Sequence, residues 1–109
     1  MIPKYKLNTN MKDIWSGNLY TVNSYQSLNE TLETNKLYIF VVRSLSASYV
    51  EFIPYIHGAG NSFQHTTYDG STVVRWRIDI NSKGTEFRLS DASLNMGSNT
   101  GILAVYKLG

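Results

Sequence analysis

Apolar and polar side chains alternate along Thr72–Ile80, and this is the clearest pattern in the chain. Every second residue is apolar: Val74, Trp76, Ile78 and Ile80. The residues between them include Arg75, Arg77 and Asp79. A period of two is typical of a strand with one face in the core and the other facing solvent or a partner. We therefore predict a half-buried strand here, with Trp76 in the core.

The same alternation returns in residues 85–91, where Phe87 and Leu89 oppose charged and polar neighbours. The tetrapeptide Asn81-Ser82-Lys83-Gly84 separates the two segments. Its composition is typical of a tight turn. The pattern therefore predicts a β-hairpin, with Phe87 facing the core.

Residues 36–43 read KLYIFVVR, a continuous apolar run rich in β-branched and aromatic side chains. Such a run favours a central strand buried on both faces, with Phe40 in the core. In residues 49–56, Pro54 favours an edge strand or a bulge, because proline cannot donate to a sheet. We predict further strands at residues 12–16, 19–22, 25–28 and 102–107, the first two flanking Ser16-Gly17-Asn18.

One helical candidate exists, because Ser27-Leu28-Asn29-Glu30 fits a capping box before residues 31–33. It predicts one or two turns at most. About seven to nine short strands with turn signals between them and almost no helix indicate an all-β fold. We predict an antiparallel β-sandwich or jelly roll, with a small barrel as the competing architecture.

The length of 109 residues fits one domain with one core. Residues 1–10, with Pro3 and the Asn8-Thr9-Asn10 cluster, are predicted to form an N-terminal arm outside the core that is flexible or docks on a neighbouring subunit. Residues 11–109 then form a single β-sandwich domain. Only 17% of the residues are charged, and 31 are Ser, Thr or Asn, so uncharged polar groups must supply much of the wetted surface.

Charge and cysteine content exclude several function classes. The net charge is only +2, without a run of like charges, which argues against nucleic acid as a partner. The longest apolar stretch is residues 37–42, too short to span a bilayer, and the N-terminus lacks the apolar segment of a signal peptide. We therefore expect neither membrane insertion nor export. With no cysteine, thiolate metal sites and cysteine nucleophiles are excluded.

The longest polar stretch, residues 57–71, is predicted to be a loop and holds most of the candidate binding residues. His57 and His65 flank Gly58-Ala59-Gly60-Asn61, but their spacing fits no compact metal motif, and only Asp69 offers a third ligand nearby. Tyr55 and Tyr68 lie near or within the stretch and are suited to stacking on a sugar or packing on a protein. The candidate ligand-binding residues are therefore Tyr55, His57, His65 and Tyr68, with no metal and no cofactor expected.

The eight carboxylates are scattered through turns and polar strand faces. Glu51 and Asp79 are the pair most able to approach each other, although each also suits a cross-strand contact with Arg75, Arg77 or Arg88. The sequence has no nucleophile elbow, P-loop or dinucleotide fingerprint. We therefore expect no catalytic residues and a protein that is not an enzyme.

The two ends of the chain carry a resemblance to a known family. Residues 13–19 (DIWSGNL), followed by residues 27–32 and the buried run 37–42, resemble the opening of small β domains in bacteriophage tail, tail-fibre and baseplate proteins. Residues 97–109 resemble the final strand of those domains, which follows a turn rich in Gly and Asn, with Lys107 where the family usually has Gly. The likeness covers nearly the whole chain loosely.

This resemblance implies a non-enzymatic virion protein, similar to domains of receptor-binding proteins of phages that infect Gram-positive bacteria. Its implied partners are other phage tail proteins, host cell-wall polysaccharide and further copies of itself, with a homotrimer favoured because phage tails use threefold and sixfold symmetry. The implied location is the virion, after synthesis in the host cytoplasm. The alternative hypothesis is a free-standing carbohydrate-binding module that uses Tyr55, Tyr68 and the histidine segment.

Overall fold

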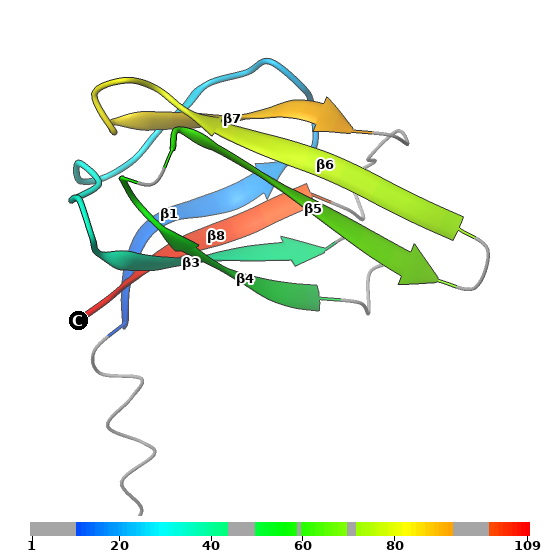
Figure 1. Cartoon of the computed structure of the whole chain (residues 1–109), viewed down its shortest axis with the longest axis horizontal. Helices are drawn as coiled ribbons and strands as arrows, with labels where there is room; N and C mark the ends of the chain where they lie inside the picture. The colour runs from blue at the N-terminus through cyan, green and yellow to red at the C-terminus, as the bar shows by residue number, and fades with distance from the viewer. Residues whose placement is uncertain (1–10, 44–49, 59, 70–71, 93–100) are drawn as a thin grey trace, which may run out of the picture.

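The chain is described by a computed structural model, in which residues 11–43, 50–58, 60–69, 72–92 and 101–109 are placed. For residues 67–69, 72–74 and 92 only the backbone is described. The described residues form eight strands and no helix. The strands make two antiparallel sheets that face each other as two layers (Figure 1). The expectation of an all-β antiparallel sandwich is confirmed.

Sheet A has the strand order β1-β8-β3-β4 and sheet B the order β2-β7-β6-β5. In sheet A the strands are β1 (Met11–Leu19), β8 (Gly101–Leu108), β3 (Leu37–Arg43) and β4 (Val50–Ile56). In sheet B they are β2 (Gln26–Ser27), β7 (Glu86–Ala92), β6 (Thr72–Ile80) and β5 (Ser62–Asp69). The edge position of β4 agrees with the expectation from Pro54.

The β6–β7 hairpin forms where the sequence predicted it. Asn81 and Gly84 close the turn, because the Gly84 amide donates to the Asn81 carbonyl at 3.0 Å. The Asn81 side-chain oxygen accepts from the amides of Thr85 and Glu86 at 2.8 and 3.0 Å. A short polar side chain that bonds nearby backbone is why Asn is favoured in turns.

One correction concerns residues 16–18, which are not a turn between two strands. They lie within β1, which is continuous from Met11 to Leu19 but carries irregularities in its pairing with β8. The first is a bulge, since Asp13 pairs with Tyr106 and Trp15 with Val105, leaving Ile14 unpaired. The extra residue lets both Ile14 and Trp15 contribute to the core.

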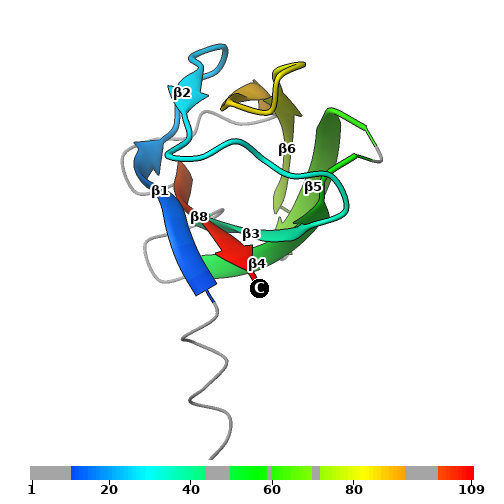
Figure 2. The same ribbon diagram turned by 90° about the vertical axis from the view of Figure 1, so that its left-hand side faces the viewer.

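A second correction concerns the helical candidate, which is wrong. Ser27 pairs with Glu86 in β2, and the amides of Leu28 and Leu32 donate to the carbonyls of Thr85 and Gly84 in the β6–β7 turn. These donors are therefore bound to another segment and cannot form a helical turn. The connection from β2 to β3 instead crosses the end of the space between the sheets (Figure 2), with Leu32 buried in the core.

A third correction concerns residues 57–71, which are not one long loop. Residues 62–69 form β5, which pairs with β6 along its whole length. Only His57 lies in the turn after β4, whereas His65 lies within β5 opposite Trp76. The predicted arm at residues 1–10 lies outside the described residues.

Aromatic side chains from both sheets meet in the core. Phe40 of β3 makes edge contacts with Phe63 of β5 and Phe87 of β7, with ring centroids 5.1 and 5.7 Å apart. The indole of Trp15 packs on Phe87 at 5.0 Å. Phe40, Trp76 and Phe87 are fully buried, as predicted. The complete buried cluster is Ile14, Leu19, Leu32, Tyr38, Phe40, Val42, Tyr55, Trp76, Ile78, Ile80, Phe87, Leu89, Ile102 and Val105.

We expect Gly101→Ala to destabilise the fold by about 3 kcal/mol, because it adds a clash to a strained backbone. Gly101 has φ +144°, and a Cβ there would lie 2.7 Å from the Leu19 carbonyl oxygen. Gly60→Ala is the matched control, since its Cβ would meet nothing within 4 Å, and we expect a change within about 0.5 kcal/mol. Urea unfolding of both variants measures this, and equal losses would contradict the assigned backbone clash.

Candidate functional site

Tyr55 and His57, two of the four predicted ligand-binding residues, contact each other at the end of β4. The Tyr55 hydroxyl lies 2.8 Å from His57 Nδ1 and donates to the Gly60 carbonyl oxygen at 3.0 Å. A hydroxyl that donates to Gly60 and accepts from a protonated Nδ1 satisfies all three groups. The backbone of His57 is held by the two residues before β3, because its amide donates to the Lys36 carbonyl and its carbonyl accepts from the Asn35 amide.

The ring of Tyr55 is packed inside the protein. It is only 7% exposed and stacks on Phe63 with ring centroids 4.7 Å apart and planes 19° apart. Burial raises the pKa of the Tyr55 hydroxyl, and the neighbouring Tyr38 adds to the shift. The hydroxyl therefore stays protonated at neutral pH and acts as a structural hydrogen-bond donor.

His65 belongs to a different cluster. Its Nε2 lies 2.7 Å from Glu51 Oε2, which joins the edge strand β5 of sheet B to the edge strand β4 of sheet A. Its ring also packs on Trp76, with centroids 5.3 Å apart. The structure thus separates His65 from the Tyr55–His57 pair.

The fourth candidate, Tyr68, lies on β5 opposite Val73, and its side chain is outside the described part. Among the described residues, no three His, Asp or Glu side chains gather as a metal site requires. Ligand binding by Tyr55, His57, His65 and Tyr68 stays a prediction, for which the structure supplies one contact pair rather than a single convergent site.

The acidic pair considered from the sequence does not form between Glu51 and Asp79. Asp79 instead accepts from Arg88 at 3.3 Å and lies 3.4 Å from Arg77, as its alternative cross-strand role predicted. With Arg75 and Asp91, 3.5 Å apart, these groups occupy the outward face of β6 and β7. The described outward side chains of β6 and β7 are therefore polar, and both aspartates are paired with arginines.

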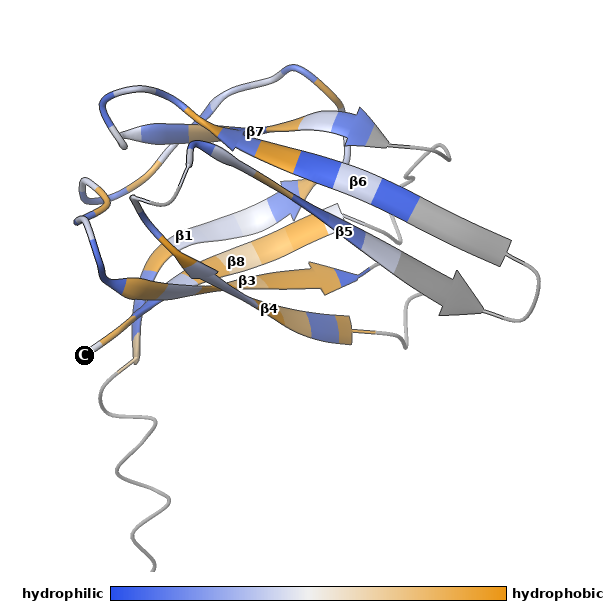
Figure 3. Ribbon diagram, in the orientation of Figure 1, coloured by the Kyte–Doolittle hydropathy of each residue, from blue (hydrophilic) through white to orange (hydrophobic). Residues whose placement is uncertain are grey.

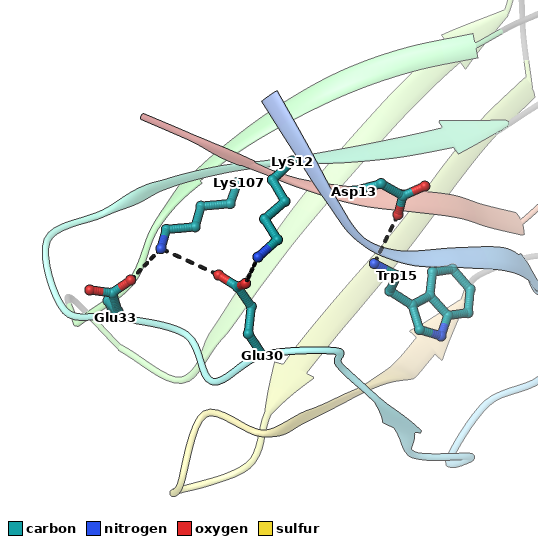
Figure 4. A network of polar contacts seen from close by, with 6 residues as sticks. All are labelled: Lys12, Asp13, Trp15, Glu30, Glu33 and Lys107. Atoms are coloured by element: carbon teal, nitrogen blue, oxygen red, sulfur yellow. Dashed lines mark hydrogen bonds and ion pairs between the residues drawn. The ribbon is translucent and has the colours of Figure 1, made fainter. Parts of the chain in front are cut away.

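Four charged side chains close the end of the sandwich beside β1 and β8. Glu30, from the β2–β3 connection, lies between Lys12 of β1 and Lys107 of β8, at 2.5 and 3.3 Å (Figure 4). Lys107 also pairs with Glu33. Hydrogen bonds from Lys12 lower the pKa of Glu30, and those from Lys107 lower the pKa of Glu33. This network fixes the connection that replaces the predicted helix.

The outward face of sheet A is the largest feature that the sequence reasoning did not single out. Val41 and Ala104 are buried yet lie outside the core cluster, because they point away from sheet B. Phe52 and Ile56 of β4 are 66% and 57% exposed. Cross-strand partners share a face, so the register places Asp13 and Arg43 on it together with ten apolar residues: Leu37, Ile39, Val41, Val50, Phe52, Pro54, Ile56, Ala104, Tyr106 and Leu108.

We call these ten residues the apolar face. Figure 3 shows the contrast, since β3 and β8 are apolar along nearly their whole length whereas β6 alternates. The sequence itself indicates this apolar outward face, because a strand with apolar residues at consecutive positions must present some of them on each face. The run at residues 36–43 predicts a strand buried on both faces, but within the described residues another layer covers only the inward face of sheet A.

The described residues include no helix with the length and apolar character needed to span a bilayer. No family model, curated protein or solved structure matches this chain.

We expect Tyr55→Phe to cost about 1 kcal/mol at neutral pH, because the hydroxyl's hydrogen bonds are lost. Because the pKa of Tyr55 is raised in the folded protein, its hydroxyl contributes fully to folding stability below the ordinary tyrosine pKa of 10.0. This contribution declines as the pH rises through the pKa of the folded state. The stability difference between native protein and variant should therefore shrink above pH 10. Unfolding curves across pH measure this, with the exposed Tyr25→Phe as control; a difference independent of pH would contradict the assignment.

Proposed function

We propose that this chain is a non-enzymatic structural protein that works through protein–protein contacts in a bacteriophage virion, as part of the tail or baseplate. The observation that carries the contact function is the apolar face of sheet A. Its β4 residues Val50, Phe52, Pro54 and Ile56 are exposed, and exposed apolar area on a folded protein is typical of an interaction site. The polar outward face of sheet B, whose arginines and aspartates are paired, provides the contrasting solvent-facing side.

The contacts of two groups, the Tyr55 hydroxyl and the Asp79 carboxylate, support a structural rather than a catalytic role. The Tyr55 hydroxyl is held protonated between His57 and Gly60. Asp79 is paired with two arginines, Arg77 and Arg88. These groups stabilise strand ends and strand faces, which is the ordinary use of such residues in a sandwich.

The phage assignment rests on the resemblance at Trp15-Ser16-Gly17 and at the last strand. The structure gives a physical reason for the first of these motifs. A Cβ at Gly17 would lie 3.0 Å from the Trp15 indole, so a small residue two positions after Trp15 lets the ring fold along the strand and reach Phe87. The motif therefore acts as a packing signature, which suits a family defined by architecture rather than chemistry.

A carbohydrate-binding module receives less support. Stacking on a sugar needs an open aromatic face, whereas the ring of Tyr55 is buried against Phe63. Contact with host cell-wall polysaccharide therefore belongs to the proposal only as a secondary activity of an assembled virion.

The virion assignment is tested by immunogold electron microscopy with an antibody to the purified chain. Particles are collected from lysed cells that carry the gene, and particles from a deletion strain serve as the control. We expect gold on tails or baseplates in the first sample only. Recovery of the chain solely in the particle-free fraction would overturn the assignment. Saturable binding of the isolated chain to cell-wall polysaccharide, without virion labelling, would favour the carbohydrate-binding module.

A further inference from the structure

We propose that the apolar face binds the same face of a second copy of this chain, giving a two-fold dimer in which two A sheets pack against each other. This inference deepens the proposed function and rests on it only for its biological setting. It concerns the protein's own association, which can be measured without a virion.

The composition of the apolar face suits a copy of itself. All ten residues are apolar or aromatic, and the nearest charged groups in register are Asp13, beside Tyr106, and Arg43, opposite Val50. One acid and one base at the margin leave no excess of either sign, and the chain's net charge is only +2. Two copies can therefore meet without like charges being forced together, as burial of charge at an interface centre would otherwise oppose association.

The shape of the face suits the same partner. A twisted sheet packs best against another sheet of similar twist, with strand directions within about 30° and a separation of about 10 Å. Sheet B already covers one face of sheet A. A second copy supplies a further sheet with matching twist and the same pattern of large side chains on β4 beside small ones such as Ala104.

The area of the apolar face determines how tightly two copies are expected to bind each other. The face lies on three strands, β3, β4 and β8, and three strands about 4.8 Å apart and about seven residues long give a footprint of roughly 340 Å². A specific interface usually buries about 800 Å² of accessible surface per partner. Exposed side chains as large as Phe52 and Ile56 increase the accessible area beyond the footprint. We therefore expect a dimer at the small end of specific interfaces, visible as a concentration-dependent equilibrium rather than a permanent assembly.

The number of apolar surfaces on each chain, among the described residues, favours a dimer over a trimer. A two-fold contact uses one surface twice, whereas a closed ring needs two different complementary surfaces on each chain. A smaller group of exposed apolar side chains, Tyr20, Val22 and Tyr25, lies on the β1–β2 connection. The Tyr25 ring in that group is already covered by the Arg88 guanidinium at 4.9 Å. Among the described residues, the best partner for the apolar face is therefore the same face of a second copy, so we expect a dimer; the trimer implied by the family resemblance is the alternative that the experiment distinguishes.

The experiment is sedimentation equilibrium of the full chain over a wide concentration range. We expect a monomer–dimer equilibrium whose upper limit is twice the chain mass of 12.3 kDa. The double variant Phe52→Thr/Ile56→Thr should weaken association about tenfold or more, because it truncates the two most exposed side chains of the face. Both positions are exposed on an edge strand, and Thr retains strand propensity, so the monomer should keep its fold, as circular dichroism will check.

The matched control is Tyr20→Thr/Val22→Thr, which removes exposed apolar side chains from the other group and should leave the dissociation constant unchanged. A chain that stays monomeric at every concentration would overturn the inference, as would a trimer as the final species or equal weakening by both double variants. Virion labelling is measured separately. A monomer found on virions would refute the dimer alone, whereas a dimer absent from virions would refute the virion role alone.

Discussion

The packing of Phe40 between the two sheets is the contact on which the rest of the structure depends. Its ring meets Phe63 and Phe87 of sheet B and Tyr55 of sheet A, so three strands besides its own are held through one side chain. Because neighbouring residues of a strand point to opposite faces, the inward position of Phe40 directs Ile39 and Val41 outward. The core contact that builds the sandwich thus also creates the apolar face of sheet A.

This geometric constraint gives the molecule two unlike outer surfaces. On sheet B, the residues that alternate with Trp76, Ile78 and Ile80 in β6 are charged, so one face of this strand fills the core and the other presents paired groups such as Arg77 and Asp79. On sheet A, the residues between the core positions of β3 are aliphatic. A small protein with one polar and one apolar outer face is suited to assembly. This difference between the two outer faces supports the proposed function more strongly than any cluster of titratable groups in the described residues.

Strands whose pattern arises from local alternation were predicted well from the sequence. The predicted range of β6 is the observed one, and the Asn81–Gly84 turn forms through bonds between close neighbours. The predictions that were wrong concern residues whose structure depends on contacts with distant parts of the chain. Leu32 and Glu33 lie outside a helix because Gly84 and Lys107, far along the chain, supply stronger contacts. Of the site residues, Tyr55 and His57 meet because they are two positions apart, whereas the pairing of His65 with Glu51 depends on how the two sheets pack.

The most direct test of the central claim, that the apolar face of sheet A is an interface, is to follow backbone amide chemical shifts by NMR during dilution. The account predicts that concentration-dependent shifts cluster in Leu37–Arg43, Val50–Ile56 and Gly101–Leu108, while the amides of β6 and β7 stay constant. Shifts centred on Thr72–Ile80 and Glu86–Ala92, or no change at any concentration, would contradict it.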